Sequence, residues 1–138
     1  MLMISVVSCS EILVKTELIR FEIDERANFN HPIAMDLLII YDEELLKKLS
    51  ELTATDWFKQ RSQFKEDNST TLSTWEWELV PGQKNFSFRM PSNTKEAQGV
   101  LLFVHYKGEG EHRKSLDSEP LVTVRLEEEK VVVQPLKY

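Results

Sequence analysis

Glycine, proline and cysteine are all scarce in this chain, with four, five and one of them among 138 residues. With so few turn-forming residues and no internal repeat, we expect neither long linkers nor low-complexity tracts. The length predicts one domain that is large enough to bury a sizeable core. A single cysteine excludes both an intrachain disulfide and a cysteine-rich metal site.

A basic stripe is also missing from the sequence. The 17 Lys and Arg residues are interspersed with 23 Asp and Glu residues, and the net charge is -6. Nucleic acid and anionic membrane surfaces are therefore poor candidate partners. Hydrophobic residues make up 41% of the chain and charged residues 29%, as is typical of a soluble globular domain.

Signals for catalysis and metal binding are equally sparse. The three histidines, His31, His105 and His112, form no pair at a spacing that would hold a metal. No G-x-S-x-G motif occurs, and the loop that contains Gly108 and Gly110 carries acidic residues, which would repel a pyrophosphate. We therefore predict no catalytic residue, no metal site and no cofactor, and we expect a protein that is not an enzyme.

The strongest pattern in the chain is the stretch Ser73–Met90. Large apolar side chains alternate with polar ones on both sides of Pro81-Gly82, a pair typical of a type II turn. We interpret the stretch as a β-hairpin with two Trp, two Phe, a Leu and a Met on one face. Because an isolated two-stranded hairpin is not stable in water, a second layer must cover this face.

Apolar or alternating stretches elsewhere predict further strands. They are Ile12–Asp24, Ile33–Tyr41, Val100–Tyr106, Leu121–Leu126 and Val131–Gln134. The second is apolar on both faces toward its end, which suits a central strand covered on both sides. Loops are expected at 92–98 and 107–117, and His105 is expected to be a hydrogen-bonded packing residue. The pattern favours a mainly β fold, a two-sheet antiparallel β-sandwich of about seven or eight strands.

One segment, at about 43–66, has a helical pattern instead. Asp42 can cap a first helix in which leucines recur at helical spacing, and Thr53 or Thr55 can cap a second. The apolar side of the second helix comprises Trp57, Phe58 and Phe64. We expect this two-helix insert to follow the second strand and to cover an end or face of the sandwich. A partner-binding helix is the alternative.

The N-terminal residues 1–8 are almost wholly apolar and are followed directly by Cys9. Val6-Val7-Ser8-Cys9 fits the end of a bacterial lipoprotein signal, with a small residue before the cysteine. Residues 1–9 would then be the remnant of the signal and the lipidation site, and 10–138 a single sandwich domain. Because the positive n-region of a signal is missing, a frayed apolar terminus, or a first strand with a small buried cysteine, is the alternative.

The order of these elements resembles the outer-membrane lipoproteins of bacterial type VI secretion systems, the TssJ-type family. The likeness extends from about Cys9 to Val133. Family members carry a lipidated cysteine, a strand, a loop ending near proline, an apolar strand closing on tyrosine, a helical insert, a Pro-Gly turn and an Arg-bearing loop. The corresponding segments here are Cys9, Leu18–Asp24, Asn28–Pro32, Leu37–Tyr41, Glu43–Lys65, Pro81-Gly82 and His112-Arg113-Lys114.

The resemblance implies a transthyretin-like sandwich with a small helical addition. It implies a structural protein without cofactors, held in the outer membrane by acylated Cys9 and facing the periplasm. The partner would be the periplasmic C-terminal region of the large inner-membrane subunit of the secretion system, the TssM type. In the family the loop between the first two strands makes that contact. The residues at its position here are Arg26, Asn28, Phe29, Asn30 and His31.

A soluble, unlipidated β-sandwich module that binds a peptide or small ligand is the other interpretation of the same sequence. Its site would lie at a strand edge or at a loop end. Phe29 lies in the polar connection at 25–32, where it is expected to be either a peg into the domain's own end or a contact for a partner.

Overall fold

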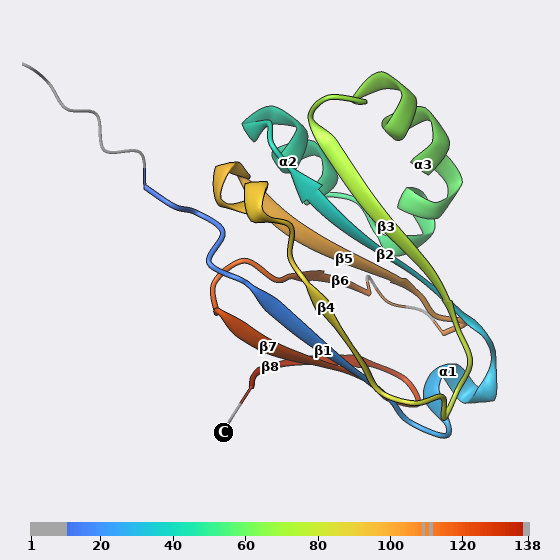
Figure 1. Ribbon diagram of the computed structural model, residues 1–138. Coiled ribbons are helices and arrows are strands. Elements are labelled where there is room, and N and C mark those ends of the chain that lie inside the picture. The colour runs from blue at the N-terminus through green and yellow to red at the C-terminus, as the bar shows by residue number, and fades with distance from the viewer. Residues whose placement is uncertain (1–10, 109, 111, 137–138) are drawn as a thin grey trace, which may run out of the picture.

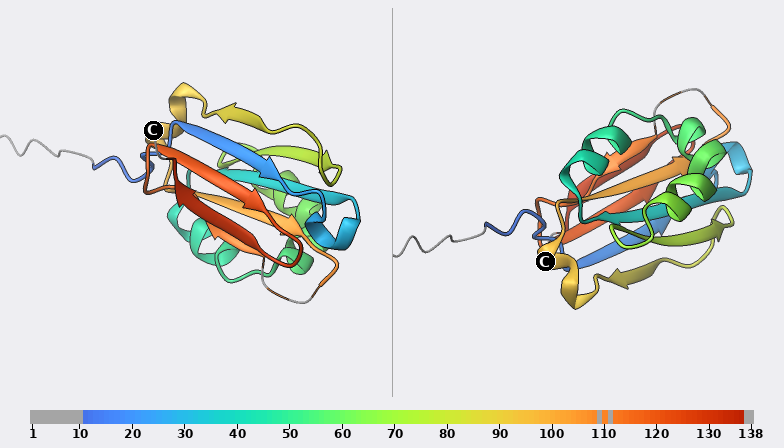
Figure 2. Two further views of the ribbon diagram at one scale, coloured as in Figure 1. Left: turned by 90° about the horizontal axis from the view of Figure 1, so that it is seen from below. Right: turned by 90° about the horizontal axis from the view of Figure 1, so that it is seen from above.

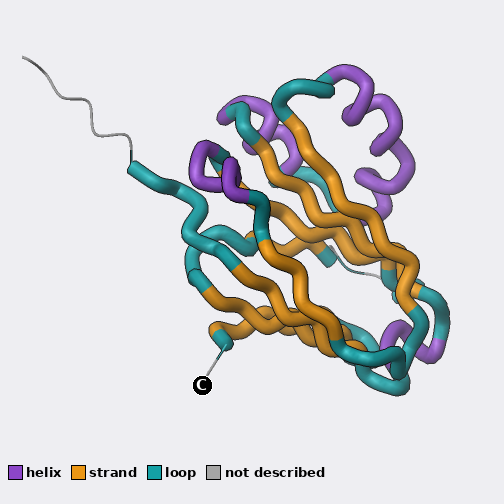
Figure 3. Tube along the Cα trace, viewed as in Figure 1, coloured by secondary structure: helices purple, strands orange, loops and turns teal. Residues whose placement is uncertain are grey.

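The computed structural model describes residues 11–108, 110 and 112–136, which form two four-stranded sheets packed face to face (Figure 1; Figure 3). The strands are β1 (Leu18–Ile23), β2 (Ile33–Ile40), β3 (Leu72–Leu79), β4 (Phe86–Arg89), β5 (Gly99–His105), β6 (Arg113–Ser115), β7 (Leu121–Leu126) and β8 (Val131–Pro135). One sheet has the order β4-β1-β7-β8 and the other β3-β2-β5-β6. The predicted two-sheet sandwich is confirmed, although β1 and β7 are a parallel pair.

Two helices follow β2, as predicted, and lie on the outer face of the β3-β2-β5-β6 sheet (Figure 2). The helices and helical turns are α1 (Ala27–Asn30), α2 (Glu43–Leu49), α3 (Ala54–Asp67) and the 3-10 turn η1 (Ser92–Glu96). The Asp42 carboxylate caps α2 by accepting from the backbone N–H of Leu45 at 2.9 Å. The Thr53 hydroxyl caps α3 by accepting from Asp56 N–H at 3.1 Å, so Thr53 rather than Thr55 begins that helix.

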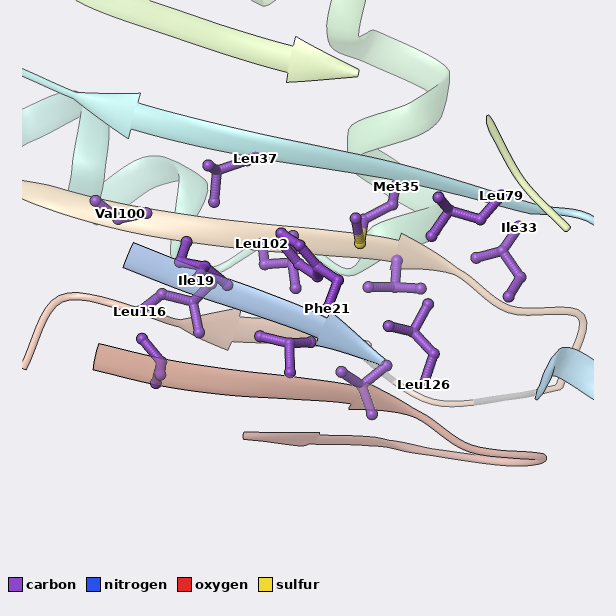
Figure 4. Close-up of a cluster of buried hydrophobic side chains, with 14 of the residues drawn as sticks. Ile19, Phe21, Ile33, Met35, Leu37, Leu79, Val100, Leu102, Leu116 and Leu126 are labelled. Atoms are coloured by element: carbon purple, nitrogen blue, oxygen red, sulfur yellow. The ribbon is translucent and has the colours of Figure 1, made fainter. Parts of the chain in front are cut away.

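The two faces of the β3-β2-β5-β6 sheet carry separate cores. The larger core fills the space between the sheets and includes Ile19, Phe21, Met35, Leu37, Leu102 and Leu126 (Figure 4). The smaller core lies beneath the helices and includes Leu38, Ile40, Leu45, Leu49, Trp57 and Phe103. β2 contributes alternate side chains to both, which confirms the expectation of a central strand that is apolar on both faces.

The predicted hairpin at Ser73–Met90 is wrong in its pairing. β3 pairs with β2 and β4 pairs with β1, so the chain crosses from one sheet to the other between them. The turn itself is as predicted, since Gln83 N–H donates to the Val80 carbonyl at 3.0 Å and Gly82 has φ 75°. The pairing was missed because alternation specifies which face of a strand is buried, and not which strand lies beside it.

The aromatic faces of β3 and β4 cover one another across the sandwich. The ring of Trp77 lies 5.9 Å from that of Phe86 and 5.5 Å from that of Phe88, and Trp75 lies 5.3 Å from Phe88. All four side chains are half-buried and pack against the larger core. Each strand thus supplies the layer that the other strand requires.

Four smaller expectations also need correction. The first strand begins at Leu18 rather than Ile12, because residues 11–17 belong to no strand. The expected loop at 107–117 contains β6, which pairs with β5, and the loop at 92–98 contains η1. His105 is exposed, and its ring stacks on that of Phe58 at 4.9 Å, so it packs against a helix rather than inside the sheet.

Candidate functional site

The segment between β1 and β2 forms a single tight turn, α1, at the end of the sandwich opposite the N-terminal segment (Figure 1). Three successive residues, Asn28, Phe29 and Asn30, have φ of 50°, 53° and 62°. This left-handed region is unfavourable for residues with a Cβ, least so for Asn. Such a turn persists only where the surrounding structure holds it.

Asn28 is the residue that holds this turn. It is 2% exposed, its Oδ1 accepts from Lys107 N–H at 2.6 Å, and its Nδ2 donates to the Pro32 carbonyl at 3.0 Å. The backbone N–H groups of Asn28 and Phe29 donate to the carbonyls of Glu127 and Glu128 at 3.3 and 3.2 Å. The turn is therefore tied to both neighbouring loops, β5–β6 and β7–β8, and Asn28 shapes the surface rather than belonging to it.

We expect Asn28→Ala to lower the free energy of unfolding by about 2 kcal/mol, because it removes the buried amide that bonds both the Lys107 N–H and the Pro32 carbonyl. Asn30→Ala is the control, since Asn30 is exposed and has a similar positive φ of 62°, and it should cost less. Urea denaturation of both variants measures the difference. Equal losses for the two would show that the hydrogen bonds of the Asn28 side chain are not what holds the turn.

The other four predicted contact residues lie together on the surface of this turn. Arg26, Phe29, Asn30 and His31 are all exposed, and Phe29 retains 40% of its accessible surface. The edge of the Phe29 ring lies against Gly108, where an added Cβ would come within 3.3 Å of it. The ring is thus partly a peg against its own domain and partly available to a partner.

Hydrogen bonds fix the polar part of this surface. His31 Nδ1 lies 2.9 Å from the Phe29 carbonyl, and His31 Nε2 lies 3.3 Å from Lys107 Nζ. One tautomer satisfies both contacts, with Nδ1–H donating to the carbonyl and Nε2 accepting from the ammonium. The Arg26 side chain is 80% exposed, and its Nη2 lies 3.8 Å from Glu128 Oε1, which is a long and weak ion pair. The Arg26 guanidinium is therefore available to bind another anion.

Residues distant in the sequence support the turn from below. The Tyr106 hydroxyl donates to the Glu127 carbonyl at 2.7 Å. Burial raises the pKa of Tyr106, as do the nearby Asp24 and Glu127, so the phenol remains a neutral donor. Asp24 in turn pairs with Arg125 at 3.0 Å. Sequence patterns gave no sign of these supports, since the two partners of each pair are 21 and 101 residues apart in the chain.

A second buried polar cluster joins α3 to the sheet. Asp36 on β2 is 1% exposed and accepts from Trp57 Nε1 at 2.8 Å and from Arg61 Nη1 at 3.1 Å. Burial raises the pKa of Asp36. Arg61 also pairs with Glu76 at 3.1 Å, and Glu76 with Lys65 at 2.6 Å. The cluster fastens the helix to β2 and β3, and the sequence offered only one hint of it, a charged residue in an apolar strand.

The N-terminal segment enters the sandwich at the other end, and Cys9 itself lies outside the described residues. Residues 11–17 lead into β1, whose C-terminal end approaches α1 (Figure 1; Figure 2). No helix in the described part of the chain has both the length and the apolar character needed to cross a bilayer. Within that part, no group of His, Cys, Asp and Glu is arranged to hold a metal ion.

No family model and no curated protein matches this sequence. Among solved structures, the type VI secretion lipoprotein TssJ1 of Pseudomonas aeruginosa matches with a TM-score of 0.66 at 12% identity. The match covers 90% of this chain and 98% of that one. This chain has the fold of the type VI secretion lipoproteins.

Lip of Serratia marcescens, described as a membrane-bound component of the type VI secretion system, has the TssJ-like fold as well. It matches with a TM-score of 0.63 at 16% identity, over 91% of this chain and 98% of its own. The resemblance drawn from the order of the sequence elements is therefore confirmed at the level of the fold. Because the identities are 12% and 16%, the comparison shows a shared fold and assigns no role to individual residues.

Proposed function

We propose that this protein is a structural lipoprotein of a type VI secretion membrane complex. In this proposal acylated Cys9 anchors it to the outer membrane, and the α1 turn binds the periplasmic C-terminal region of a TssM-type inner-membrane subunit. The observation that carries the proposal is the TssJ-like fold over nearly the full length of both chains. The order of the elements in the sequence supports it independently: the signal-like Val6-Val7-Ser8-Cys9, the strands, the helical insert and the Pro-Gly turn.

The geometry of the sandwich supports this division of labour. The N-terminal segment and the α1 turn lie at opposite ends, so a membrane anchor at one end leaves the other end free (Figure 1). The six residues of β1 alone span about 20 Å. The hydrogen-bonded supports of α1 hold the turn in one shape, which lowers the entropy cost of binding a partner.

Anchoring is tested by Cys9→Ser. We expect the variant to keep its fold and to move from the membrane fraction to the soluble fraction, because several acyl chains hold a protein firmly and none remains. Fractionation of the native host, with the mass of the N-terminal peptide, measures both localisation and acylation. Unchanged membrane association, or a free thiol on Cys9 in the wild-type protein, would contradict the anchor and leave the soluble binding module as the function.

Partner binding is tested by Phe29→Ala and Arg26→Ala. We expect each to weaken binding of the TssM-type periplasmic region, Phe29→Ala by about 2 kcal/mol or more and Arg26→Ala by about 1 kcal/mol. Leu13→Ala is the matched control, since Leu13 is 47% exposed at the opposite end of the sandwich. Calorimetric titration measures the affinities. If the control weakens binding as much as Phe29→Ala, the contact does not lie on α1.

A further inference from the structure

A pocket of about 680 Å³ lies at the N-terminal end of the sandwich, opposite α1. Its lining residues come mainly from the segment before β1, the end of β4 and η1. These elements lie together at that end of the sandwich (Figure 1). Its apolar lining comes from Ile12, Val14, Met90, Pro91 and Pro120. The volume is in the range of about 300–1,000 Å³ that sites for small molecules occupy.

The polar lining of this pocket is cationic. Lys15, Arg89 and Lys95 line it together with a single carboxylate, that of Glu17. All three cationic residues are exposed, and none is in an ion pair with another described residue. In a chain of net charge -6, this local excess of positive charge stands out and favours an anionic ligand.

One hydroxyl in the lining has no partner among the described residues. Thr94 is 3% exposed, and its buried Oγ1 makes no hydrogen bond. The other buried threonine of the pocket, Thr16, donates to the carbonyls of Leu116 and Glu119. An unsatisfied buried hydroxyl is unusual in a folded protein, and at a pocket it is a feature of sites that take a ligand or an ordered water.

We propose that this pocket binds an acyl lipid with an anionic head group. The apolar lining receives the chain, and Lys15, Arg89 and Lys95 receive the head. The diacylglyceryl group of an acylated cysteine carries no charge, so it does not use the cationic rim, and the occupant is a separate lipid molecule. The proposal depends on the pocket alone and not on acylation of Cys9, so either proposal can fail without the other.

The low overall basicity of the chain does not conflict with this site. The three cationic residues come from three separate segments, 12–17, β4 and η1, and only the fold brings them together. A pattern that is assembled by the fold leaves no basic run in the sequence.

Binding is tested with the full-length Cys9→Ser chain and two soluble single-chain probes, oleoyl lysophosphatidylglycerol and oleoyl lysophosphatidylcholine. The probes share the chain and differ in net head charge. Native mass spectrometry and calorimetric titration should show one molecule of the anionic lipid per chain, bound about tenfold or more tightly than the zwitterionic one. Equal affinities, no binding, or equally tight binding of glycerophosphoglycerol without a chain would overturn the proposal.

Two pairs of variants then locate the lipid. Ile12→Asp should weaken binding about tenfold by placing a charge in the apolar lining, while Leu13→Asp changes it less than about twofold. Both residues are nearly half exposed, at 48% and 47%, so we expect both variants to fold, and of the two only Ile12 lines the pocket. Equal losses in the two variants would place the lipid elsewhere.

The second pair tests the head group. The double variant Arg89→Glu with Lys95→Glu should weaken binding of the anionic lipid about tenfold or more. The double variant Lys59→Glu with Lys84→Glu makes the same change in net charge at exposed positions outside the pocket lining. If this control loses as much affinity, the attraction is non-specific and the proposal is wrong.

Discussion

Replacing Trp57 with alanine is expected to lower the free energy of unfolding by about 3–5 kcal/mol. The indole is fully buried between α3 and the sheet, and its ring stacks on Phe103 at 5.5 Å and on Phe64 at 5.9 Å. Truncation removes these contacts, leaves a cavity and takes the N–H away from Asp36. A domain of this kind is stable by only about 5–15 kcal/mol, so the loss is a large part of the total.

Trp57→Phe separates the packing of the ring from its hydrogen bond. It retains an aromatic ring in the smaller core but cannot donate to Asp36, so we expect a loss of about 1–3 kcal/mol. Urea denaturation followed by circular dichroism measures both variants. A cost below about 1 kcal/mol for Trp57→Ala would mean that α3 is not fastened through this side chain.

The second large effect is expected for Asp36→Ala, which should lower the free energy of unfolding by about 3 kcal/mol. The substitution leaves the buried N–H of Trp57 without an acceptor and removes the carboxylate that faces Arg61. Because about a third of the Arg61 side chain is exposed, water compensates part of the loss at that end. The variant should also loosen α3, which amide hydrogen exchange along the helix would detect.

Glu76→Gln is the matched control for Asp36. Glu76 belongs to the same cluster and pairs with Lys65 and Arg61, but 34% of its side chain is exposed. Neighbouring positive charge lowers the pKa of Glu76, with the Lys65 hydrogen bond the main cause. We expect Glu76→Gln to lower the free energy of unfolding by less than about 1 kcal/mol, as is usual for exposed ion pairs. Equal effects at Asp36 and Glu76 would contradict the assignment of the stabilisation to the buried carboxylate.

The elements with local signals were predicted best. The caps at Asp42 and Thr53 and the turn at Pro81-Gly82 depend on a few adjacent residues, and the structure has all three. The two-sided burial of β2 also follows from its own composition. In each case the physical cause lies within the segment, so the sequence alone was sufficient.

The pairing of the strands could not be derived in the same way. β3 and β4 are consecutive and have matching aromatic faces, yet they lie in different sheets. β6 has only three residues, of which none is fully buried, so it lacks the apolar alternation that identifies a strand. Which strand pairs with which depends on contacts across the whole fold.

The candidate site shows the same limit. Its position was predicted as the loop between the first two strands, but the buried role of Asn28 was not. Two asparagines around Phe29 are a signal that could have indicated the left-handed turn, because Asn tolerates positive φ better than other residues with a Cβ. The cationic pocket had no such signal, because its charges come from separate segments.

The parallel pairing of β1 with β7 has a consequence for the order of folding. β1 is an inner strand of its sheet, and the neighbour on one side is made about a hundred residues later. A chain that emerges from its N-terminus cannot complete this sheet until β7 and β8 have been released. Although β1 precedes all the other described strands, it gains its parallel neighbour only after every strand of the other sheet has been made.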